Sequence, residues 1–305
     1  MEHKSAFVAI VGRPNTGKST LVNAIVGSKV AITSHHPNTT RSAIRGIATH
    51  PDFQLVLVDT PGLHKPKTLL GGALNAMVTD SMESVDVILQ CFPATEAIGS
   101  GDRFIAQELA NHKSAKKIAA VTMIDMVDRS KVPETLMSVS GLAKELGFEW
   151  DEIVPLSAKT DTQVQTLIDL LVKYAPVGPA FYPAEMSSDQ EMSLAIADLI
   201  REAAISEMME ELPHSIAVVV DEFSKREDKK DFFDIHASII VERESQKGII
   251  IGKKGDRLKQ IGQDARGEIE KKLKARVFLG LHVKVMPNWQ GDPKALQRLG
   301  FSEQN

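Results

Sequence analysis

Apolar residues in the first half of the chain occur in short runs of strand length, and between these runs they recur at helical spacing. This alternation predicts strands and helices in turn, which is the order of a doubly wound α/β fold with a mostly parallel sheet. Ligands of such folds bind at the carboxyl ends of the strands. The predicted strands cover residues 7–11, 42–49, 54–58, 85–92, 117–123 and 153–156. A first helix is predicted to begin at residue 20, and further helices to cover 69–82, 102–111 and 134–146.

The second half of the chain follows another order, in which a helix over 191–211 precedes two strands, two helices and a last strand. This order indicates a smaller α+β domain. A stretch rich in proline and small polar residues separates the halves, and we interpret it as a linker. We expect one domain over residues 1–176, a linker over 177–190 and a second domain over 191–305. The strands of the second domain are predicted at 215–223, 233–243 and 277–285, and its later helices at 246–251 and 256–273.

The composition is that of an ordinary globular protein, with 305 residues, 43% of them hydrophobic and 25% charged. No apolar run reaches transmembrane length and the amino terminus lacks the pattern of a signal peptide, so we expect a cytoplasmic protein. The single cysteine, Cys91, lies in an apolar run and has no partner for an internal disulfide. We expect it to be a core residue in a reducing compartment.

Charge is distributed unevenly along the chain. The net charge is −4, yet residues 247–276 contain ten Lys or Arg and four Asp or Glu, an excess of +6, so the remainder carries −10. A basic module attached to an acidic one is typical of a protein that binds nucleic acid through one of its domains.

The predicted strand 7–11 leads directly into the motif G-x-x-x-x-G-K-S, which ends where a helix is expected to begin. This spacing is that of a phosphate-binding loop, in which glycines let successive N–H groups face one concave site and the helix adds its positive end. A glycine-rich turn without function is the alternative, and the strand–loop–helix context counts against it. The residues expected to hold a nucleotide here are Gly12, Arg13, Pro14, Asn15, Thr16, Gly17, Lys18, Ser19 and Thr20.

A second strand end carries the sequence Asp-Thr-Pro-Gly at residues 59–62. Phosphate-loop enzymes need a second carboxylate for Mg²⁺ at the end of a strand, and Asp59 is placed to provide it. The N–H group of Gly62 could sense the γ-phosphate. Between the two motifs, a threonine of the polar stretch 33–41 could supply a second hydroxyl to the metal ion.

Two further strand ends are candidates for contact with the base. A buried carboxylate at Asp125 can accept hydrogen bonds from the two donors of guanine, whereas adenine lacks this pair of donors. Ser157 and Ala158 follow the next strand. The alternative for Asp125 is an acidic residue that caps the following helix.

Gly252, Lys253, Lys254 and Gly255 form a G-x-x-G loop between two predicted helices. In KH domains such a loop clamps the backbone of single-stranded RNA through its N–H groups and basic side chains. We expect Ile249 and Ile250 to contribute an apolar groove for the bases. The alternative is a charged helix–turn–helix with a solvated face.

Taken together, these motifs resemble those of the Era GTPases over essentially the full length of the chain. The resemblance implies a GTPase domain followed by a type II KH domain that binds small-subunit ribosomal RNA near its 3′ end, and a role in assembling the small ribosomal subunit. It implies GTP or GDP and Mg²⁺ as cofactors, and we expect a monomer. Peripheral association with the inner face of the cell membrane is also implied, although no segment indicates it. The motifs that carry the resemblance are GRPNTGKST, TTR, DTPGLH, SAK, ELPHS, SQKGIIIGKKG and NWQGDPKALQRLGF.

The resemblance also implies roles for individual residues. Lys18 neutralises the phosphates and Gly62 senses the γ-phosphate, while Mg²⁺ is held by Ser19, Thr40 and Asp59. The residue after Gly62 is a leucine, which cannot orient the attacking water, so we expect slow intrinsic hydrolysis. Similarity to potassium-using GTPases suggests Asn15 as a ligand of K⁺, which would place positive charge where the transition state develops negative charge.

The chain departs from the family at Thr122-Met123-Ile124-Asp125, where the family pattern is Asn-Lys-x-Asp. Thr122 can still join the strand to the phosphate loop, and Met123 can make the apolar contact of a lysine stem without its ammonium. We expect the guanine preference to survive through Asp125 and the affinity to fall. Two alternatives remain open, an RNA-binding assembly chaperone with little hydrolysis and an ATPase, the second disfavoured by Asp125.

Overall fold

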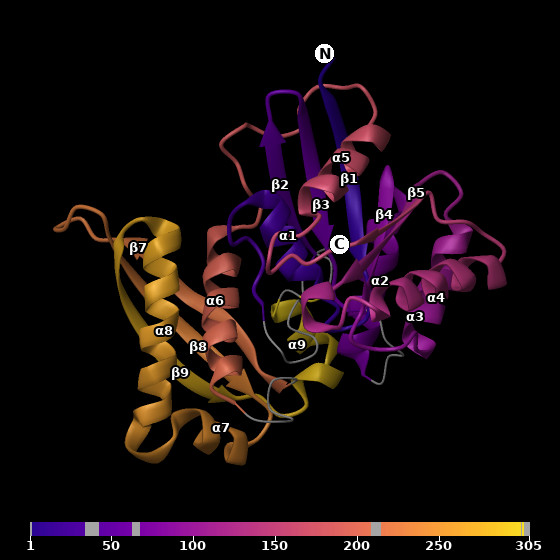
Figure 1. The fold of residues 1–305 in the computed structure, drawn as a ribbon. Helices are drawn as coiled ribbons and strands as arrows, with labels where there is room; N and C mark the ends of the chain where they lie inside the picture. The colour runs from indigo at the N-terminus through magenta and orange to yellow at the C-terminus, as the bar shows by residue number, and fades with distance from the viewer. Residues whose placement is uncertain (1, 34–42, 63–67, 209–214, 300, 302–305) are drawn as a thin grey trace. The chain divides into compact units, whose positions relative to one another are not determined.

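The structure, a computed structural model, describes residues 2–33, 43–62, 68–208, 215–299 and 301 (Figure 1). Within these residues the first half of the chain forms a six-stranded sheet in the order β2-β3-β1-β4-β5-β6. Only β2 runs antiparallel to its neighbour, so the predicted mostly parallel, doubly wound sheet is confirmed. The strands are β1 (Lys4–Val11), β2 (Ile44–His50), β3 (Phe53–Asp59), β4 (Val87–Pro93), β5 (Lys116–Thr122) and β6 (Glu152–Pro155).

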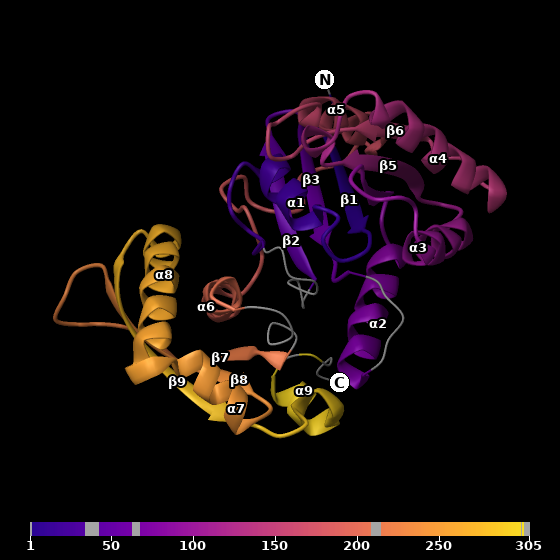
Figure 2. The same cartoon turned by 60° about the horizontal axis from the view of Figure 1, so that its bottom comes forward.

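Successive side chains of β1 enter cores on opposite faces of the sheet, because side chains alternate along a strand. Val8 and Ile10 pack with residues of α1 and α5, whereas Ala9 and Val11 pack with residues of α2 and α3. Further along the second face, α3 and α4 share another core (Figure 2). The helices are α1 (Lys18–Val26), α2 (Leu69–Glu83), α3 (Ser100–Asn111), α4 (Lys131–Glu145) and α5 (Val164–Tyr174).

Helix α5 has no counterpart among the sequence predictions. Its buried residues Val164, Leu167 and Leu171 are spaced three and four positions apart, which is the signature of an amphipathic helix. That spacing was therefore available as a signal. The helix matters to the fold because it covers the face of the sheet that it shares with α1.

The segment expected to link the domains packs along the first of them. The Phe181 ring lies 4.7 Å from that of Phe7, and the buried Gln54 side chain accepts hydrogen bonds from the N–H groups of Phe181 and Tyr182 at 2.7 and 2.9 Å. The chain divides into two compact units, and the boundary between their main parts lies between Asp189 and Gln190.

The second unit has a three-stranded sheet in the order β7-β8-β9, with β7 antiparallel and β9 parallel to β8. Helices α6 and α8 pack on one face of this sheet, where Ile196, Ile261 and Ile269 are fully buried (Figure 2). This order of elements is that of a type II KH domain. The elements are α6 (Met192–Ser206), β7 (Ala217–Lys225), β8 (Phe232–Val241), α7 (Glu244–Ile251), α8 (Asp256–Leu273), β9 (Arg276–Val285) and the unpredicted α9 (Pro293–Arg298). Among the helices in the described ranges, none is both long enough and apolar enough to cross a bilayer.

Candidate functional site

The phosphate loop connects β1 to α1 and is shaped by two glycines. A Cβ on Gly12 would lie 2.8 Å from the Thr16 hydroxyl oxygen and 3.0 Å from the Cys91 carbonyl oxygen, so no side chain fits there. Gly17 has a φ of 84°, in the left-handed region that glycine adopts without strain. Asn15 is exposed at the outer bend of the loop, with a φ of 61°. The loop thus has the tight curvature that lets backbone N–H groups face an anion.

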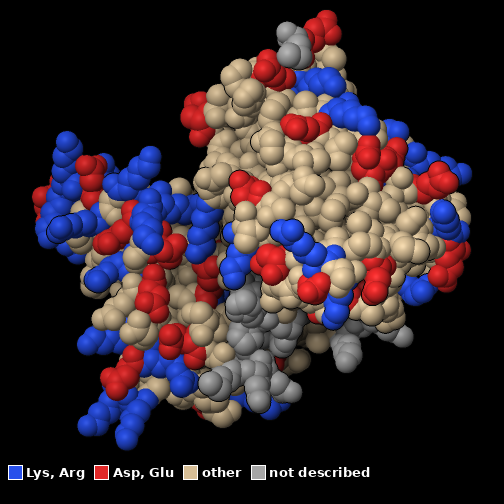
Figure 3. Space-filling model, viewed as in Figure 1, with Lys and Arg blue, Asp and Glu red and all other residues tan. Residues whose placement is uncertain are grey.

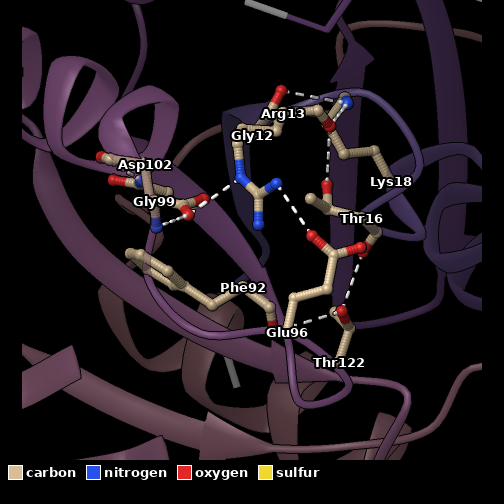
Figure 4. A network of polar contacts seen from close by, with 10 residues as sticks. Gly12, Arg13, Thr16, Lys18, Phe92, Glu96, Gly99, Asp102 and Thr122 are labelled. Atoms are coloured by element: carbon tan, nitrogen blue, oxygen red, sulfur yellow. Dashed lines mark hydrogen bonds and ion pairs between the residues drawn. The ribbon is translucent and has the colours of Figure 1, made fainter. Parts of the chain in front are cut away.

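Lys18, the first residue of α1, is buried and its ammonium is held in place by the loop itself. Its Nζ atom donates hydrogen bonds to the carbonyl oxygens of Gly12 at 3.1 Å and Arg13 at 2.8 Å (Figure 4). Burial lowers the pKa of Lys18, and the Asp59 carboxylate opposes this effect only in part. A buried cation beside a ring of backbone N–H groups is suited to bind a phosphate.

Ser19 and Asp59 meet at the carboxyl end of β3, where the Ser19 hydroxyl donates a 2.7 Å hydrogen bond to Asp59 Oδ2. Hydroxyl and carboxylate oxygens beside a phosphate site are the ligands that Mg²⁺ prefers, so these residues fit the predicted metal site. Gly62 lies against the loop, because a Cβ there would be 2.6 Å from the backbone nitrogen of Pro14. Thr40 and Leu63 lie outside the described residues.

The base side of the site is built on the ends of β5 and β6. The buried Thr122 hydroxyl lies 2.8 Å from the Thr16 carbonyl oxygen and donates to it, which confirms the predicted connection between strand and loop (Figure 4). Met123 reaches back toward the loop, since its Cε atom would touch a Cβ on Gly17 at 3.4 Å. Asp125 was expected to be buried and is exposed, because it follows the strand end on a short 3-10 turn at the surface.

The neighbouring loop after β6 is held close to this turn. The Ile124 N–H group donates to the Leu156 carbonyl oxygen at 3.4 Å, and Ser157 exchanges two backbone hydrogen bonds with Thr162 at 3.0 and 2.9 Å. The Ser157 side chain is buried and accepts a hydrogen bond from the Thr160 N–H group, while Ala158 is half-buried. The structure therefore brings the predicted base-contacting loops together at one edge of the sheet.

The sequence prediction missed the partners of Arg13. Its guanidinium forms a 2.8 Å ion pair with Asp102 at the start of α3 and a 2.9 Å ion pair with Glu96 (Figure 4). Asp102 is 1% exposed and also accepts the Gly99 N–H group. Burial by itself lowers the pKa of Arg13, but its bonds to the two carboxylates outweigh this and raise it. Asp102 three residues after a glycine at a helix start was the available signal, since that spacing is typical of a helix cap.

The Arg13 backbone joins this ion-pair cluster to the rest of the loop. Its carbonyl oxygen accepts hydrogen bonds from the Lys18 ammonium and, at 3.0 Å, from the Thr16 hydroxyl. The Thr16 carbonyl oxygen is the one bound by Thr122. A continuous chain of contacts therefore runs from α3 through the loop to β5 and fixes the position of the Lys18 ammonium.

The second candidate site is the G-x-x-G loop between α7 and α8. Gly252, Lys254 and Gly255 all have positive φ, at 73°, 56° and 85°, and a Cβ on Gly252 would lie 2.7 Å from Cβ of Arg257. The loop therefore turns sharply, with Lys253 and Lys254 exposed at its outer side. These are the features that a clamp on a phosphate backbone requires.

One of the two predicted groove residues is placed differently. Ile249 is 41% exposed, whereas Ile250 is fully buried and cannot touch a base. Neighbouring residues of a helix point about 100° apart, so both could not face one groove. Instead, a groove of about 930 Å³ runs between α8 and β9, starting at Gly255 and lined by residues such as Leu258, Lys259 and Arg266.

Comparison with known proteins agrees with both sites. Residues 7–124 match the family described as 50S ribosome-binding GTPase, and residues 211–290 match the KH domain. GTPase Era of Streptomyces coelicolor is 55% identical over 302 residues, which cover 98% of this chain and 95% of that protein. GTPase Era of Mycobacterium tuberculosis is 53% identical over 302 residues, which cover 98% of this chain and 99% of that protein. The chain belongs to the Era GTPase family.

Solved structures of Era agree with this assignment. Era in complex with MgGDPNP and nucleotides 1506–1542 of 16S ribosomal RNA is 37% identical and has a TM-score of 0.93. The structural alignment covers 99% of this chain and 100% of that one. An Era variant from Aquifex aeolicus bound to GDP·AlF4⁻ is 36% identical and has a TM-score of 0.93. The structural alignment covers 98% of this chain and 100% of that one. As a member of the Era family, this chain is a GTPase with a carboxyl-terminal KH domain.

Proposed function

We propose that this protein is a GTP-driven switch that binds small-subunit ribosomal RNA and assists assembly of the small ribosomal subunit. The carrying observation is that one chain holds a preorganised phosphate loop, with Lys18 fixed by two carbonyl oxygens, and an exposed basic G-x-x-G loop. The similar Era structure holds MgGDPNP and a fragment of 16S ribosomal RNA at once, which supports the same pair of ligands here.

The residues of this chain divide the nucleotide chemistry among them. Lys18 and the loop N–H groups neutralise and orient the phosphates of GTP, and Ser19 and Asp59 hold Mg²⁺ together with Thr40. Mg²⁺ held by these residues would supply Lewis-acid stabilisation of the negative charge on the phosphate oxygens. Asn15, exposed at the bend of the loop, is the proposed ligand of K⁺.

The deciding experiment measures turnover of GTP and ATP by the full chain, with and without the RNA fragment 1506–1542, in potassium and in sodium buffers. We expect the chain to hydrolyse GTP in preference to ATP. Its rate of GTP turnover should change when RNA is added and should be higher in potassium than in sodium. In parallel, Lys253→Glu with Lys254→Glu is expected to abolish RNA binding without loss of folded structure in circular dichroism. RNA binding that persists in this double variant would place the RNA surface elsewhere, and equal turnover in the two buffers would remove K⁺ from the proposal.

A second candidate function is an RNA-binding assembly chaperone with little hydrolysis. Two observations favour it, the methionine at position 123 where the family has lysine and the exposure of Asp125. If the chain binds RNA but turns over GTP no faster than its Lys18→Ala variant, this result would support the chaperone in place of the switch.

Because the proposed RNA partner is part of the ribosome, we also propose that the protein acts in the cytoplasm. We further propose that it is a monomer. Sedimentation velocity of the full chain tests the oligomeric state, and a single species of about twice the chain mass would contradict it. Binding of the full chain to phosphatidylserine vesicles tests peripheral association with a membrane.

A further inference from the structure

The groove beside α8 does not end at the far end of that helix. A second hollow of about 740 Å³ adjoins it and shares Phe232, Glu270 and Arg276 with it. The hairpin between β7 and β8 forms one wall of this second hollow, and the residues that follow α8 form the other. Four cations line it: Lys229 and Lys230 from the hairpin, Lys274 after α8 and Arg276 at the start of β9.

Two carboxylates, Asp231 and Glu270, also line this hollow, so its four cations leave an excess of two positive charges. No carboxylate among the described residues lies within ion-pair distance of Lys229, Lys230, Lys274 or Arg276. Both carboxylates have other partners, since Glu270 accepts the Val277 N–H group at 3.1 Å and Asp231 lies 4.0 Å from the Lys225 ammonium. Figure 3 shows Lys and Arg side chains gathered near both ends of α8, with acidic residues interspersed between them.

The hairpin is held against the start of β9. The Arg276 N–H group donates to the Asp231 carbonyl oxygen at 3.0 Å, and the Arg226 N–H group donates to the Phe232 carbonyl oxygen at 2.9 Å. The Phe232 ring lies 5.1 Å from the Lys229 ammonium, within the range of a cation–π contact. A cluster that is already positioned loses less conformational entropy on binding an anion.

We propose that this hollow is a second phosphate-binding site, which holds the backbone of an RNA strand that has passed along the groove from the G-x-x-G loop. The inference rests on the proposed RNA-binding function of the KH domain. A G-x-x-G loop clamps about four nucleotides. Helix α8 has 18 residues and is about 27 Å long, so the second site lies well beyond that loop. It engages only an RNA long enough to follow the whole groove.

The geometry favours RNA over an anionic lipid surface. The hollow continues a groove, and its aromatic residue Phe232 is half-buried between the hairpin and β9 rather than exposed for insertion into a bilayer. A groove with cations at both ends fits a strand that carries one phosphate per nucleotide.

The test compares Lys229→Ala with Lys230→Ala against a matched double variant, Lys271→Ala with Lys294→Ala. Lys271 lies on α8 outside both hollows and pairs with Glu268, and Lys294 is exposed on α9. Each double variant removes two positive charges from the same domain. The probes are the 16S ribosomal RNA fragment 1506–1542 and a series of single-stranded pieces of it, shortened stepwise from either end.

We expect the hairpin variant to bind the long RNA about fivefold more weakly than the wild type, as for two exposed charge contacts. The slope of log affinity against log salt should fall by about 1.4, because two phosphate contacts to a single strand are lost. The shortest bound pieces should show no difference, and the control variant should resemble the wild type on every RNA.

Each other outcome has a definite meaning. If the wild type binds none of the RNAs, the proposed function itself is wrong. If the wild type binds short and long RNA equally, or if the control variant loses as much as the hairpin variant, only the second site is overturned. Loss of binding to phosphatidylserine vesicles by the hairpin variant, with unchanged RNA binding, would assign the cluster to a membrane surface.

Discussion

The phosphate loop and the G-x-x-G loop both bind phosphates in our assignment, yet the protein builds them in opposite ways. In the first, the charged group of Lys18 is buried and held by two carbonyl oxygens, and contacts from α3 and β5 fix the loop around it. In the second, Lys253 and Lys254 are exposed on a turn with positive φ at Gly252, Lys254 and Gly255.

This difference follows from what each site must do. Hydrolysis requires stabilisation of charge that develops at fixed atoms, so the donors must be preorganised in a dry site. Clamping an RNA backbone requires attraction to many equivalent phosphates, which exposed lysines provide in a salt-dependent way. The first site should therefore respond sharply to the loss of one contact, and the second should respond to charge and ionic strength.

The largest effect should come from Lys18→Ala. We expect GTP turnover to fall about 10²- to 10³-fold, because a positioned donor to the phosphates is lost. RNA binding measured without nucleotide should be unchanged. Lys131→Ala is the matched control, because Lys131 also begins a helix but is exposed. Retention of turnover in the Lys18 variant would show that its buried ammonium does not act on the nucleotide.

A smaller effect is expected on stability from Arg13→Ala, which leaves the buried Asp102 carboxylate without its cation. Removing one member of a fully buried pair costs about 3–5 kcal/mol, and we expect about 2 kcal/mol here because Arg13 is partly exposed. Lys253→Ala in the other loop should change stability by less than about 0.5 kcal/mol.

Urea unfolding can measure the two domains separately. Trp150 lies in the first and Trp289 in the second, and the chain has no other tryptophan. Replacing one tryptophan by phenylalanine lets the other report on its own domain. Equal changes in the free energy of unfolding for the Arg13 and Lys253 variants would remove the contrast between a fixed and an exposed loop.

The smallest effect should come from Met123→Lys, which restores the family residue beside Gly17. We expect GTP to bind about threefold more tightly in a calorimetric titration, as for one added exposed charge contact. Met126→Lys is the control, since Met126 lies on the same turn and its side chain is 64% exposed. Unchanged or weaker binding would show that the apolar contact of Met123 is sufficient.

Local pattern was a good guide to the elements and a weaker one to the environment of single residues. Helix α8 has the bounds that were predicted, because its apolar spacing is regular and glycine precedes it. Asp125 and Ile250 were identified as site residues, but the exposure of the first and the burial of the second depend on how whole elements pack.

Cys91 was placed correctly in the core. It is fully buried beneath the phosphate loop, and burial raises the pKa of its thiol to about 12. The seven residues of β4 are apolar except for Gln90, and a central strand of a parallel sheet has both faces covered, so burial could be expected from the pattern.

The amino-acid order was enough to establish the two domains' folds, the phosphate loop and the G-x-x-G loop, because each depends on contiguous residues whose spacing has few solutions. The tertiary structure decided what holds those loops. Arg13 and Asp102 are 89 positions apart, Thr16 and Thr122 are 106 apart, and the hairpin lysines meet Lys274 only after β8 pairs with β9. Contacts between distant residues arise from the packing of whole elements, and no local pattern encodes them.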